Sequence, residues 1–594
     1  MSVRNPTGKT PYSPQQYSFW RVLFFQFFSI VFIFVGLSYL SWRWTSSLNP
    51  NALWFSIPLV LAETMIFISS LLLIVNYWRS LKIKQKRPVK LLSQIEEGIS
   101  PAEDRPIKID IFITTYNEEL EVVEPTVVFA KKLEYPFEEV DIQIYLCDDG
   151  RRNGSDPDKE NFKALAEKHR INYLTRPDNT GFKAGNLNHS FWQTDGDLIV
   201  ILDADTLVLP KFLIHLTGYF RTVKMAWVQS PQWFYDISEG RTLAEITKLH
   251  FFNYIPLLNR YKVGKNILGT DPQIFYDGIL RHRNSANAAF CCGAGSIHRR
   301  AALEGIIKNK QDRLVELKSV LPYDTDLIKN KSLYDQLNQE GKIVGPFVHH
   351  ISEDLYTSVL IHSEKEGWRS YQHPDIECMM LSPQDISGVV KQYSRYAEGT
   401  YQLFFSRDNP LFIKGLSIRQ RLGYLETIYS YFTALWVFIF LVSPIVFFFT
   451  LTPPVQAFNF DFFLRFLIFI FMNTMVASIA NWGISIKRSE QYYISGFWYK
   501  LMSFIKILTG KKMVFNTTRK KTVKSNVLNN LKHTYPHIII TFLTVAGFVW
   551  NIYLVQQGTH PSYSAFFANS MWALYNIYHL NPIIRATFIT PTDE

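Results

Sequence analysis

Six long apolar runs constrain the fold of this chain more than any other feature of its sequence. Two precede a large region of ordinary soluble composition and four follow it, at 19–40, 53–78, 428–451, 462–484, 538–555 and 565–584. A helix needs roughly 20 apolar residues to cross a hydrocarbon core about 30 Å thick. One such run could be a buried core helix, but six of them, several flanked by Trp and Tyr, predict membrane-spanning helices.

Basic residues predict the orientation of these helices. The loop 46–52 between the first two runs carries no charge, and five basic residues follow the second run, namely Lys82, Lys84, Lys86, Arg87 and Lys90. The positive-inside rule then places the central region in the cytoplasm, and the even number of runs on either side places both termini there as well. We therefore expect a multi-pass protein of the plasma (inner) membrane, in contact with the lipid bilayer.

The net charge of the chain limits the kinds of partner that we expect. The formal net charge is +11 at pH 7, which fits cytosolic loops beside an anionic leaflet and an anionic nucleotide substrate. The basic residues are dispersed rather than gathered in one stripe, so we expect no nucleic-acid partner.

The central region alternates strand-like and helix-like segments from residue 107 onward. Apolar runs such as KIDIFITT, VDIQIYLC and LIVIL are separated by helical stretches at 159–169 and from FKAGNLNHSF onward. This alternation predicts a mostly parallel sheet that binds ligands beyond the carboxyl ends of its strands. Three strands end in polar or acidic clusters, at 115–118, 148–150 and 203–205, which predicts a site at that edge.

The third cluster is Asp203-Ala-Asp205. Side chains two residues apart in an extended segment point to the same side, so the two carboxylates share a face and favour a divalent cation. The alternative is an Asp-rich turn that caps the following helix. Lys183 precedes a predicted helix, where it could reach a bound anion; the alternative is an ordinary surface lysine.

Seven motifs occur in a fixed order: TTYNE, CDDG, KAGNLN, LDAD, VQSPQ, SED and QYSRY. Together they resemble the membrane-integrated family 2 glycosyltransferases, above all the cellulose synthase group, with curdlan, mixed-linkage glucan, chitin and hyaluronan synthases as relatives. The resemblance implies an α/β GT-A glycosyltransferase domain inserted between transmembrane helices, two before it and four after it. It also implies a UDP-sugar donor and Mg²⁺ or Mn²⁺.

The resemblance divides the chain into six parts. They are an N-terminal region with two transmembrane helices (1–80), a cytosolic GT-A catalytic domain (81–365), amphipathic interfacial helices (366–424), transmembrane helices 3 and 4 (425–490), an interfacial helix with a gating-type loop (491–533), and transmembrane helices 5 and 6 (534–594).

The resemblance also implies roles for the residues at the strand ends. The nucleotide contacts would be Thr115, Tyr116, Glu118, Asp148, Lys183 and Asp203. Asp203 and Asp205 would hold the metal that neutralises the leaving diphosphate. Many cellulose synthases have a histidine where this chain has Thr206, so a supplementary metal contact is expected to be missing.

The SED motif contains Glu353 and Asp354, and resembles a motif whose last acid is the general base that deprotonates the acceptor hydroxyl. Glu353 is assigned to the same catalytic pair. The alternative, compatible with the first, is that Ser352 caps a helix with Asp354 in its first turn.

The QYSRY motif resembles the QxxRW signature of processive synthases. Gln392, Arg395 and Tyr396 fall on one face of a helix. Gln392 and Arg395 would bind the diphosphate, and Tyr396 would stack on the acceptor sugar. Tyr396 replaces the usual Trp, which leaves the linkage open. The alternative is a plain amphipathic interfacial helix.

Two further segments resemble family features. MVFNTTRKKT resembles the gating loop over the nucleotide, with Phe515, Thr517 and Thr518 as working residues and Arg519 or Lys520 near phosphate. PQWF provides Gln232 and Trp233 as expected acceptor contacts.

Polar residues interrupt the membrane runs, namely Glu63, Asn569, Asn576, His579 and Asn581. They would face protein or water rather than lipid, either along a polymer channel or in interhelical hydrogen bonds. The segment 308–348 is an unassigned insertion. Only residues 585–594 follow the last run, so we expect no cyclic-di-GMP-binding PilZ module in this chain.

The leading interpretation is a processive inverting glycosyltransferase that polymerises UDP-glucose into a β-glucan and moves it across the membrane. A β-1,4 linkage is slightly favoured over β-1,3 or mixed linkages. The nascent polysaccharide is a partner, and accessory subunits are candidates. The alternatives are a chitin- or hyaluronan-type synthase, a non-processive transferase acting on a lipid, and a scaffold with a dead transferase domain.

Overall fold

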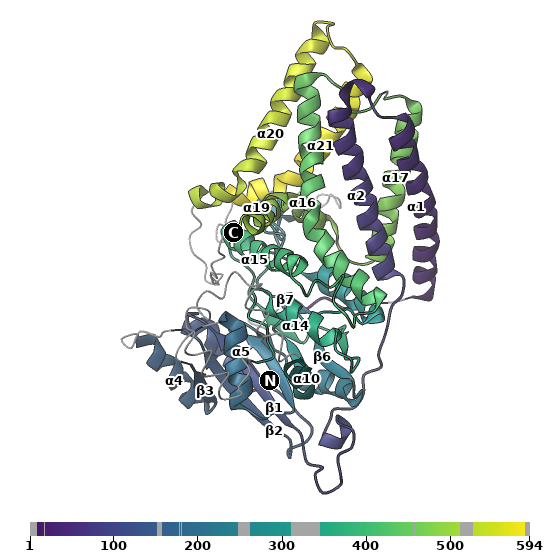
Figure 1. Ribbon diagram of the computed structural model, residues 1–594. Helices are drawn as coiled ribbons and strands as arrows, with labels where there is room; N and C mark the ends of the chain where they lie inside the picture. The colour runs from purple at the N-terminus through teal and green to yellow at the C-terminus, as the bar shows by residue number, and fades with distance from the viewer. Residues whose placement is uncertain are drawn as a thin grey trace.

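A layered α/β domain lies beneath a bundle of long helices in the computed structural model (Figure 1). The structure describes residues 9–16, 18–150, 157–176, 179, 181–247, 262–309, 345–456, 458–510 and 527–588.

A seven-stranded sheet forms the centre of the lower domain, in the order β11-β6-β10-β4-β1-β2-β3. Only β10 runs antiparallel to its neighbours. The strands are β1 (Lys108–Thr115), β2 (Asp141–Asp148), β3 (Asn172–Thr175), β4 (Leu198–Asp203), β6 (Met225–Gln229), β10 (Ser296–Arg299) and β11 (Arg369–Gln372). This arrangement confirms the predicted mostly parallel sheet.

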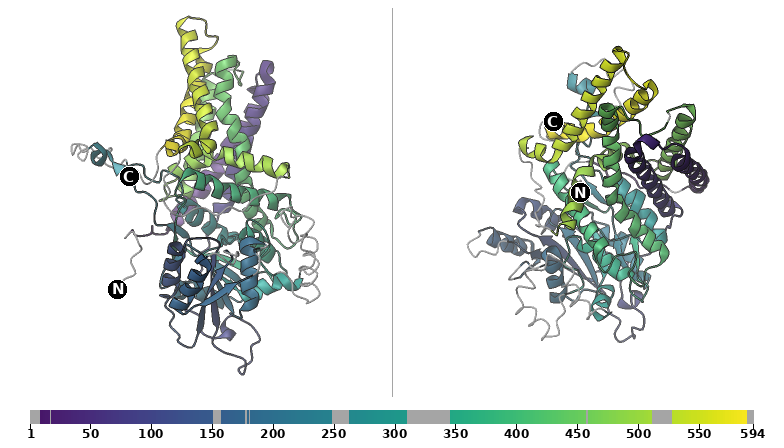
Figure 2. Two further views of the ribbon diagram at one scale, coloured as in Figure 1. Left: turned by 90° about the vertical axis from the view of Figure 1, so that its left-hand side faces the viewer. Right: turned by 45° about the horizontal axis from the view of Figure 1, so that its top comes forward.

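Helices cover both faces of this sheet (Figure 2). Alternate residues of β1 and β4 pack on opposite sides, because successive side chains of a strand point in opposite directions. Ile111 and Val200 pack with α3 (Leu120–Ala130) and α4 (Pro157–His169). Phe112 and Ile201 pack with the helices of the other face, which are α5 (Phe182–Gln193), α10 (Arg300–Asn309) and α14 (Glu353–His362).

Two small sheets lie beside the main one. The first has the order β5-β12-β7, with β5 (Leu207–Val208), β7 (Gln232–Phe234) and β12 (Cys378–Met380). The second pairs β8 (Arg241–Thr242) with β9 (Lys262–Val263). Helix α7 (Leu243–Thr247) follows β8 directly in the chain. α6 (Phe212–Leu216) and α9 (Arg281–Arg283) are short connecting helices.

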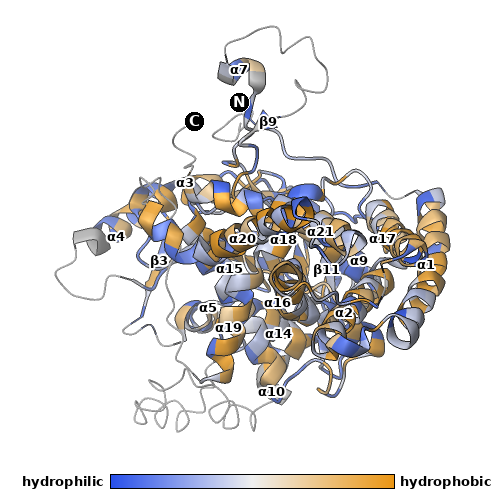
Figure 3. Ribbon diagram, turned by 90° about the horizontal axis from the view of Figure 1, so that it is seen from above, coloured by the Kyte–Doolittle hydropathy of each residue, from blue (hydrophilic) through white to orange (hydrophobic). Residues whose placement is uncertain are grey.

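Among the residues that the structure describes, five helices are long and apolar enough to cross a membrane, two before the α/β domain and three after it. They are α1 (Phe19–Ser46), α2 (Leu53–Tyr77), α16 (Ile418–Thr450), α17 (Phe460–Ala480) and α20 (Val527–Gln556). The sixth predicted run forms α21 (Tyr563–Phe588), which packs along α20 but is more polar than the other five. Seen from above, much of the helical bundle is coloured as hydrophobic (Figure 3). Many of its large apolar side chains are exposed, as lipid contact requires.

Three amphipathic helices lie between the bundle and the α/β domain, as Figure 1 shows for α15 and α19. They are α15 (Ile386–Phe405), α18 (Lys487–Ser495) and α19 (Phe497–Leu508). α15 packs against both α16 and α19, so it connects the α/β domain mechanically to the membrane helices.

Candidate active site

The polar ends of three neighbouring strands meet at one edge of the main sheet. Thr115 at the end of β1 pairs with Asp148 at the end of β2, and Thr114 pairs with Asp203 at the end of β4. The strand register therefore brings together the clusters that the sequence predicted at this edge.

The Asp203-Ala204-Asp205 turn places its two carboxylates on the same side. Both aspartates line a cavity. Ala204 between them reaches the same cavity but is only 4% exposed and packs in the core. The turn is closed by Thr206, whose side chain accepts a hydrogen bond from the backbone NH of Asp203 at 3.2 Å. Thr126 donates to the Ala204 carbonyl at 2.7 Å. These bonds hold the carboxylates in place.

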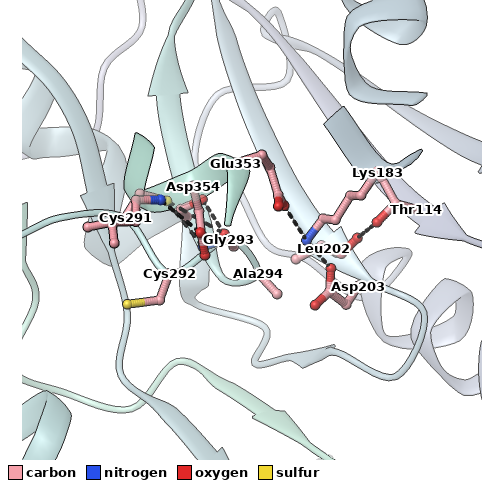
Figure 4. A network of polar contacts seen from close by, with 12 residues as sticks. Thr114, Lys183, Leu202, Asp203, Cys291, Cys292, Gly293, Ala294, Glu353 and Asp354 are labelled. Carbon is pink, nitrogen blue, oxygen red and sulfur yellow. Dashed lines mark hydrogen bonds and ion pairs between the residues drawn. The ribbon is translucent and has the colours of Figure 1, made fainter. Parts of the chain in front are cut away.

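Lys183 joins the strand ends to α14 (Figure 4). Its ammonium group forms an ion pair with Asp203 and lies 3.7 Å from Glu353 Oε1. Burial opposes its charge, but the carboxylates of Asp203, Glu353 and Asp354 outweigh this effect, so the pKa of Lys183 is raised. Lys183 is thus a fixed cation at the centre of the site and not an ordinary surface lysine.

Glu353 and Asp354 occupy the first turn of α14, and both line the cavity. Burial and the neighbouring Glu353 raise the pKa of Asp354 to about 7, and burial also raises the pKa of Glu353. A carboxyl group with a pKa close to neutrality is suited to accept a proton. Ser352 is the N-cap residue of α14 and Asp354 lies in the first turn, as expected, although the Ser352 side chain makes no capping hydrogen bond.

Gly293 leaves open the space between these groups. A Cβ atom at this position would lie 3.1 Å from Lys183 Nζ and 3.6 Å from Asp354 Oδ2, and the backbone has φ +80°. Glycine adopts this conformation without strain. Gly293 belongs to the segment FCCGAGSIHRR, which also resembles an acceptor-side segment of the family. Its two glycines before a strand are a usable signal of close backbone approach.

The loop after β1 presents Thr115, Tyr116 and Glu118 to the cavity. Glu118 Oε2 accepts hydrogen bonds from the Thr115 hydroxyl at 2.8 Å and from the backbone NH of Tyr116. Burial raises the pKa of Glu118 to about 7. The three predicted residues therefore form one hydrogen-bonded unit.

Asp148 and Asp149 have different environments. Asp148 is 1% exposed and accepts a hydrogen bond from the Tyr173 hydroxyl at 2.9 Å, and it is not among the residues that line the cavity. Asp149 does line the cavity, where it pairs with Arg176 at 2.6 Å. The sequence placed both aspartates in the predicted cluster 148–150, but the resemblance assigned a nucleotide contact to Asp148 alone.

Gln392, Arg395 and Tyr396 all face the cavity from α15. Their i, i+3 and i+4 spacing places them on one face of the helix. The Arg395 guanidinium lies 5.7 Å from the centroid of the Tyr396 ring, which is a cation–π distance. Tyr396 is 38% exposed, so its ring is available to a ligand.

The two predicted acceptor contacts lie on opposite sides of strand β7. Gln232 faces the cavity and donates to the Ala294 carbonyl at 3.0 Å. Trp233 instead packs with Phe129, Leu207 and other buried residues, because successive side chains of a strand alternate. Phe234, two residues after Gln232, lines the cavity. The predicted gating residues Phe515, Thr517, Thr518, Arg519 and Lys520 lie outside the described residues.

One cavity of about 900 Å³ connects the strand ends to the membrane helices. At the sheet it is lined by Lys183, Asp203, Asp205 and Asp354, and beside α15 by Arg395 and Tyr396. Among the membrane helices it is lined by aromatic and polar side chains, including Glu63, Trp436, Asn473, Trp572 and Asn576. The site is therefore the lower end of a path that continues into the bundle.

The polar residues predicted within the membrane segments divide into two groups. Glu63 and Asn576 line the cavity, and Glu63 is held by Arg43 at 2.7 Å. Asn569 and His579 are buried within the bundle, where Asn569 donates to the Ala565 carbonyl at 2.9 Å. Asn581 is exposed.

The donor set fits a divalent cation that arrives with a phosphorylated substrate. Asp203 and Asp205 supply carboxylate oxygens at the cavity wall. Within the described part of the chain, no group of three or more His, Cys, Asp or Glu residues could hold a metal ion. Mg²⁺ is commonly bound by one or two carboxylates together with substrate phosphates and water, which is the arrangement available here.

Two family models match this chain. Glycosyl transferase family 2 matches residues 110–307, and Cellulose synthase matches residues 327–590. The UDP-forming cellulose synthase 1 catalytic subunit of Komagataeibacter xylinus is 26% identical over 568 residues, which is 94% of this chain and 66% of that protein. The UDP-forming cellulose synthase catalytic subunit of Pseudomonas fluorescens SBW25 is 24% identical over 92% of this chain and 64% of that protein. This chain thus spans less than two thirds of either relative.

The chain is also similar to two solved structures, at low TM-scores. A mannosyltransferase from Pyrobaculum calidifontis in complex with GDP-Man and Mn²⁺ has a TM-score of 0.42 and 13% identity, over 77% of this chain and 100% of that one. A glucosyl-3-phosphoglycerate synthase from Mycobacterium tuberculosis in complex with Mg²⁺ and UDP has a TM-score of 0.27 and 12% identity, over 54% and 84% of the two chains.

Proposed function

We propose that this chain is a family 2 glycosyltransferase of the cellulose synthase type, the two families whose models match residues 110–307 and 327–590, and that it polymerises glucose from UDP-glucose into a β-1,4-glucan. The observation that carries this proposal is the cavity that joins Asp203 and Asp354 to Tyr396 and then to the membrane helices. Transfer of a single sugar requires a donor pocket and an acceptor pocket, whereas synthesis coupled to export requires a continuous path. Relatives named as UDP-forming cellulose synthase subunits support the choice of donor and linkage.

The donor binds at the strand ends. Thr115, Tyr116 and Glu118 form the hydrogen-bonded side of the pocket that would take the nucleotide. Lys183 and Arg395 supply positive charge for the diphosphate, and the planar donor fork of Arg395 suits phosphate oxygens. Asp203 and Asp205 would hold a divalent cation, which supplies charge neutralisation to the leaving diphosphate when bound.

Asp354 serves as the general base. It accepts the proton of the acceptor hydroxyl as that oxygen forms a bond to the anomeric carbon. The bond from this carbon to the UDP oxygen breaks, and its electron pair leaves with UDP. One base opposite the leaving group gives inversion at the anomeric carbon. Lys183 lies beside Glu353 and keeps the charge of this carboxylate pair balanced.

The acceptor end rests on α15. Tyr396 presents an accessible ring to the terminal sugar, and Gln232 faces the same cavity from β7. Aromatic and polar side chains continue the path between the membrane helices, where a sugar chain can stack and exchange hydrogen bonds. The catalytic domain and both termini would face the cytoplasm of the inner membrane, where UDP-sugars are supplied.

The test uses the purified chain in lipid vesicles with Mg²⁺ or Mn²⁺, supplied separately with UDP-glucose, UDP-N-acetylglucosamine and UDP-glucuronate. We expect a long polymer from UDP-glucose alone, which a β-1,4-glucanase digests. Digestion only by a β-1,3-glucanase or a lichenase would show that the product has a different linkage, but it would still identify the protein as a polymerase. Release of UDP with a single sugar transferred to lipid, and no polymer from any donor, would overturn the proposal.

A further inference from the structure

Lys500 is a buried lysine in α19 whose environment differs from that of the other lysines near the site. It is 5% exposed and lines the cavity between α15 and the membrane helices. Its ammonium group donates to the Ser430 carbonyl at 3.3 Å. It lies 4.0 Å from the centroid of the Tyr493 ring and 5.9 Å from that of Tyr431.

No acidic side chain of the described residues balances this charge. Burial alone lowers the pKa of Lys500 to about 7, and no carboxylate counteracts the shift. Lys183, in contrast, is surrounded by three carboxylates. An unpaired buried ammonium group carries a desolvation penalty, which two ring faces and one carbonyl offset only in part. The ammonium carries three donors, and the structure gives it one acceptor.

A series of tyrosine rings connects Lys500 to the predicted acceptor platform. The ring of Tyr396 lies 5.9 Å from that of Tyr393, which lies 6.0 Å from that of Tyr499, the residue before Lys500. These three tyrosines line the same cavity as Lys500. Lys500 therefore lies further along the path that leads from the reacting end toward the membrane.

We propose that Lys500, Tyr431 and Tyr493 form a second acceptor subsite, which binds hydroxyl groups of the sugar chain behind its reacting end. The ammonium group donates hydrogen bonds to sugar hydroxyls, and the two rings offer apolar faces to the pyranose. Flat aromatic faces beside a hydrogen-bond donor match a sugar, which has apolar faces and hydroxyl edges. The subsite holds the chain between additions and so sets product length. This inference rests on the proposed polymerase function.

The experiment compares Lys500→Met, Lys500→Arg and the unchanged protein in vesicles with UDP-glucose. Product length is measured by size-exclusion chromatography, and UDP release is followed in parallel. Loss of one or two hydrogen bonds to the chain should speed its dissociation, so we expect Lys500→Met to shorten the product by about fivefold. The KM for UDP-glucose should change by less than about twofold, because the donor pocket is untouched. Lys500→Arg keeps the charge and donors and should restore much of the length.

Lys487→Met is the matched control. Lys487 also contacts a tyrosine ring, at 5.3 Å from the centroid of Tyr578, but it is exposed and does not line the cavity. Its variant should make product of unchanged length. The Tm of Lys500→Met should equal or exceed that of the unchanged protein, because an unpaired buried charge has been removed.

Unchanged product length in Lys500→Met, or equal shortening in Lys487→Met, would overturn the subsite. A lower Tm with proportionally lower UDP release would assign Lys500 a structural role instead and would also overturn it. Absence of any polymer from the unchanged protein is a different result, which overturns the proposed function itself.

Discussion

At the scale of single residues, Asp354 is the proposed general base. Asp354→Asn keeps the size of the side chain and an oxygen that can accept from the Leu355 NH, now at 2.7 Å, but it removes the base. We expect polymer synthesis to fall by about 10² to 10⁴-fold, while UDP binding measured by calorimetry stays within about twofold. Asp375→Asn is the control, because Asp375 is exposed and outside the cavity. Continued synthesis in Asp354→Asn would remove Asp354 as the base.

The same carboxyl group sets the pH dependence. Burial and Glu353 raise the pKa of Asp354 to about 7, and a base acts only when deprotonated. The initial rate should therefore rise through about pH 7 and level off above it, falling about tenfold for each pH unit below. Glu118 has a similar pKa, so the profile is repeated in Glu118→Gln. Loss of the inflection in that variant would assign it to Glu118.

At the scale of elements, the contact between α14 and α15 sets the distance from the base to the acceptor platform. Gly399 of α15 packs directly on Ser352, where a Cβ would overlap Ser352 Oγ and lie 2.9 Å from Ile351 Cγ2. Gly399→Ala would stabilise an isolated helix by about 1 kcal/mol, but here it should lower both Tm and polymer synthesis. Adding Ser352→Gly should restore part of each.

The control for this prediction is another helical glycine with open space around it. A Cβ on Gly305 of α10 would make only an ordinary contact, at 3.7 Å from Trp368 Nε1. Gly305→Ala should leave the Tm and the rate unchanged or slightly raised. If Gly399→Ala behaves in the same way, the close packing of α14 on α15 does not position the site.

Elements and strand ends could be predicted from the sequence because their signals are local. Apolar runs that end in polar clusters identify β1, β2 and β4, and parallel strands share one edge. It was harder to predict which individual side chains face the cavity. Whether Trp233 or Phe234 meets the cavity depends on which side of the small sheet faces it, and whether Asp148 or Asp149 does depends on the partners Tyr173 and Arg176.

The site around Lys500 was even harder to predict from the sequence. In the sequence it is one lysine of an amphipathic helix, and nothing marks it as unpaired. Only the packing of α16 and α18 around α19 brings the rings of Tyr431 and Tyr493 to it and leaves acidic groups of the described chain too far away to affect its charge. Sites built by helices that are distant in sequence require tertiary contacts for their detection.

At the scale of the whole molecule, orientation can be measured by labelling. Asn51 lies in the uncharged loop between α1 and α2, and Glu97 lies on the side of the α/β domain, and both are exposed. In intact cells, Asn51→Cys should react with a membrane-impermeant maleimide, whereas Glu97→Cys should react only after lysis, because the positive-inside rule places the basic segment 82–90 in the cytoplasm. The reverse pattern would invert the topology. The four native cysteines are free, so their background labelling is measured on the unchanged protein.

In the proposed function the continuous cavity couples synthesis to export, and a block within the bundle should separate the two. Ser70 of α2 lines the membrane part of the cavity and donates to Asn473 Oδ1 at 2.7 Å. Ser70→Trp adds a large ring there, far from the donor pocket. We expect polymer yield to fall at least about tenfold, while the KD for UDP stays within about twofold. Ser41→Trp, on an exposed position of α1 outside the cavity, should retain normal yield, since a tryptophan facing lipid costs little. Full yield of exported polymer from Ser70→Trp would mean that the chain leaves by another route, and the donor site, base and acceptor platform would then belong to a transferase whose product does not pass through this bundle.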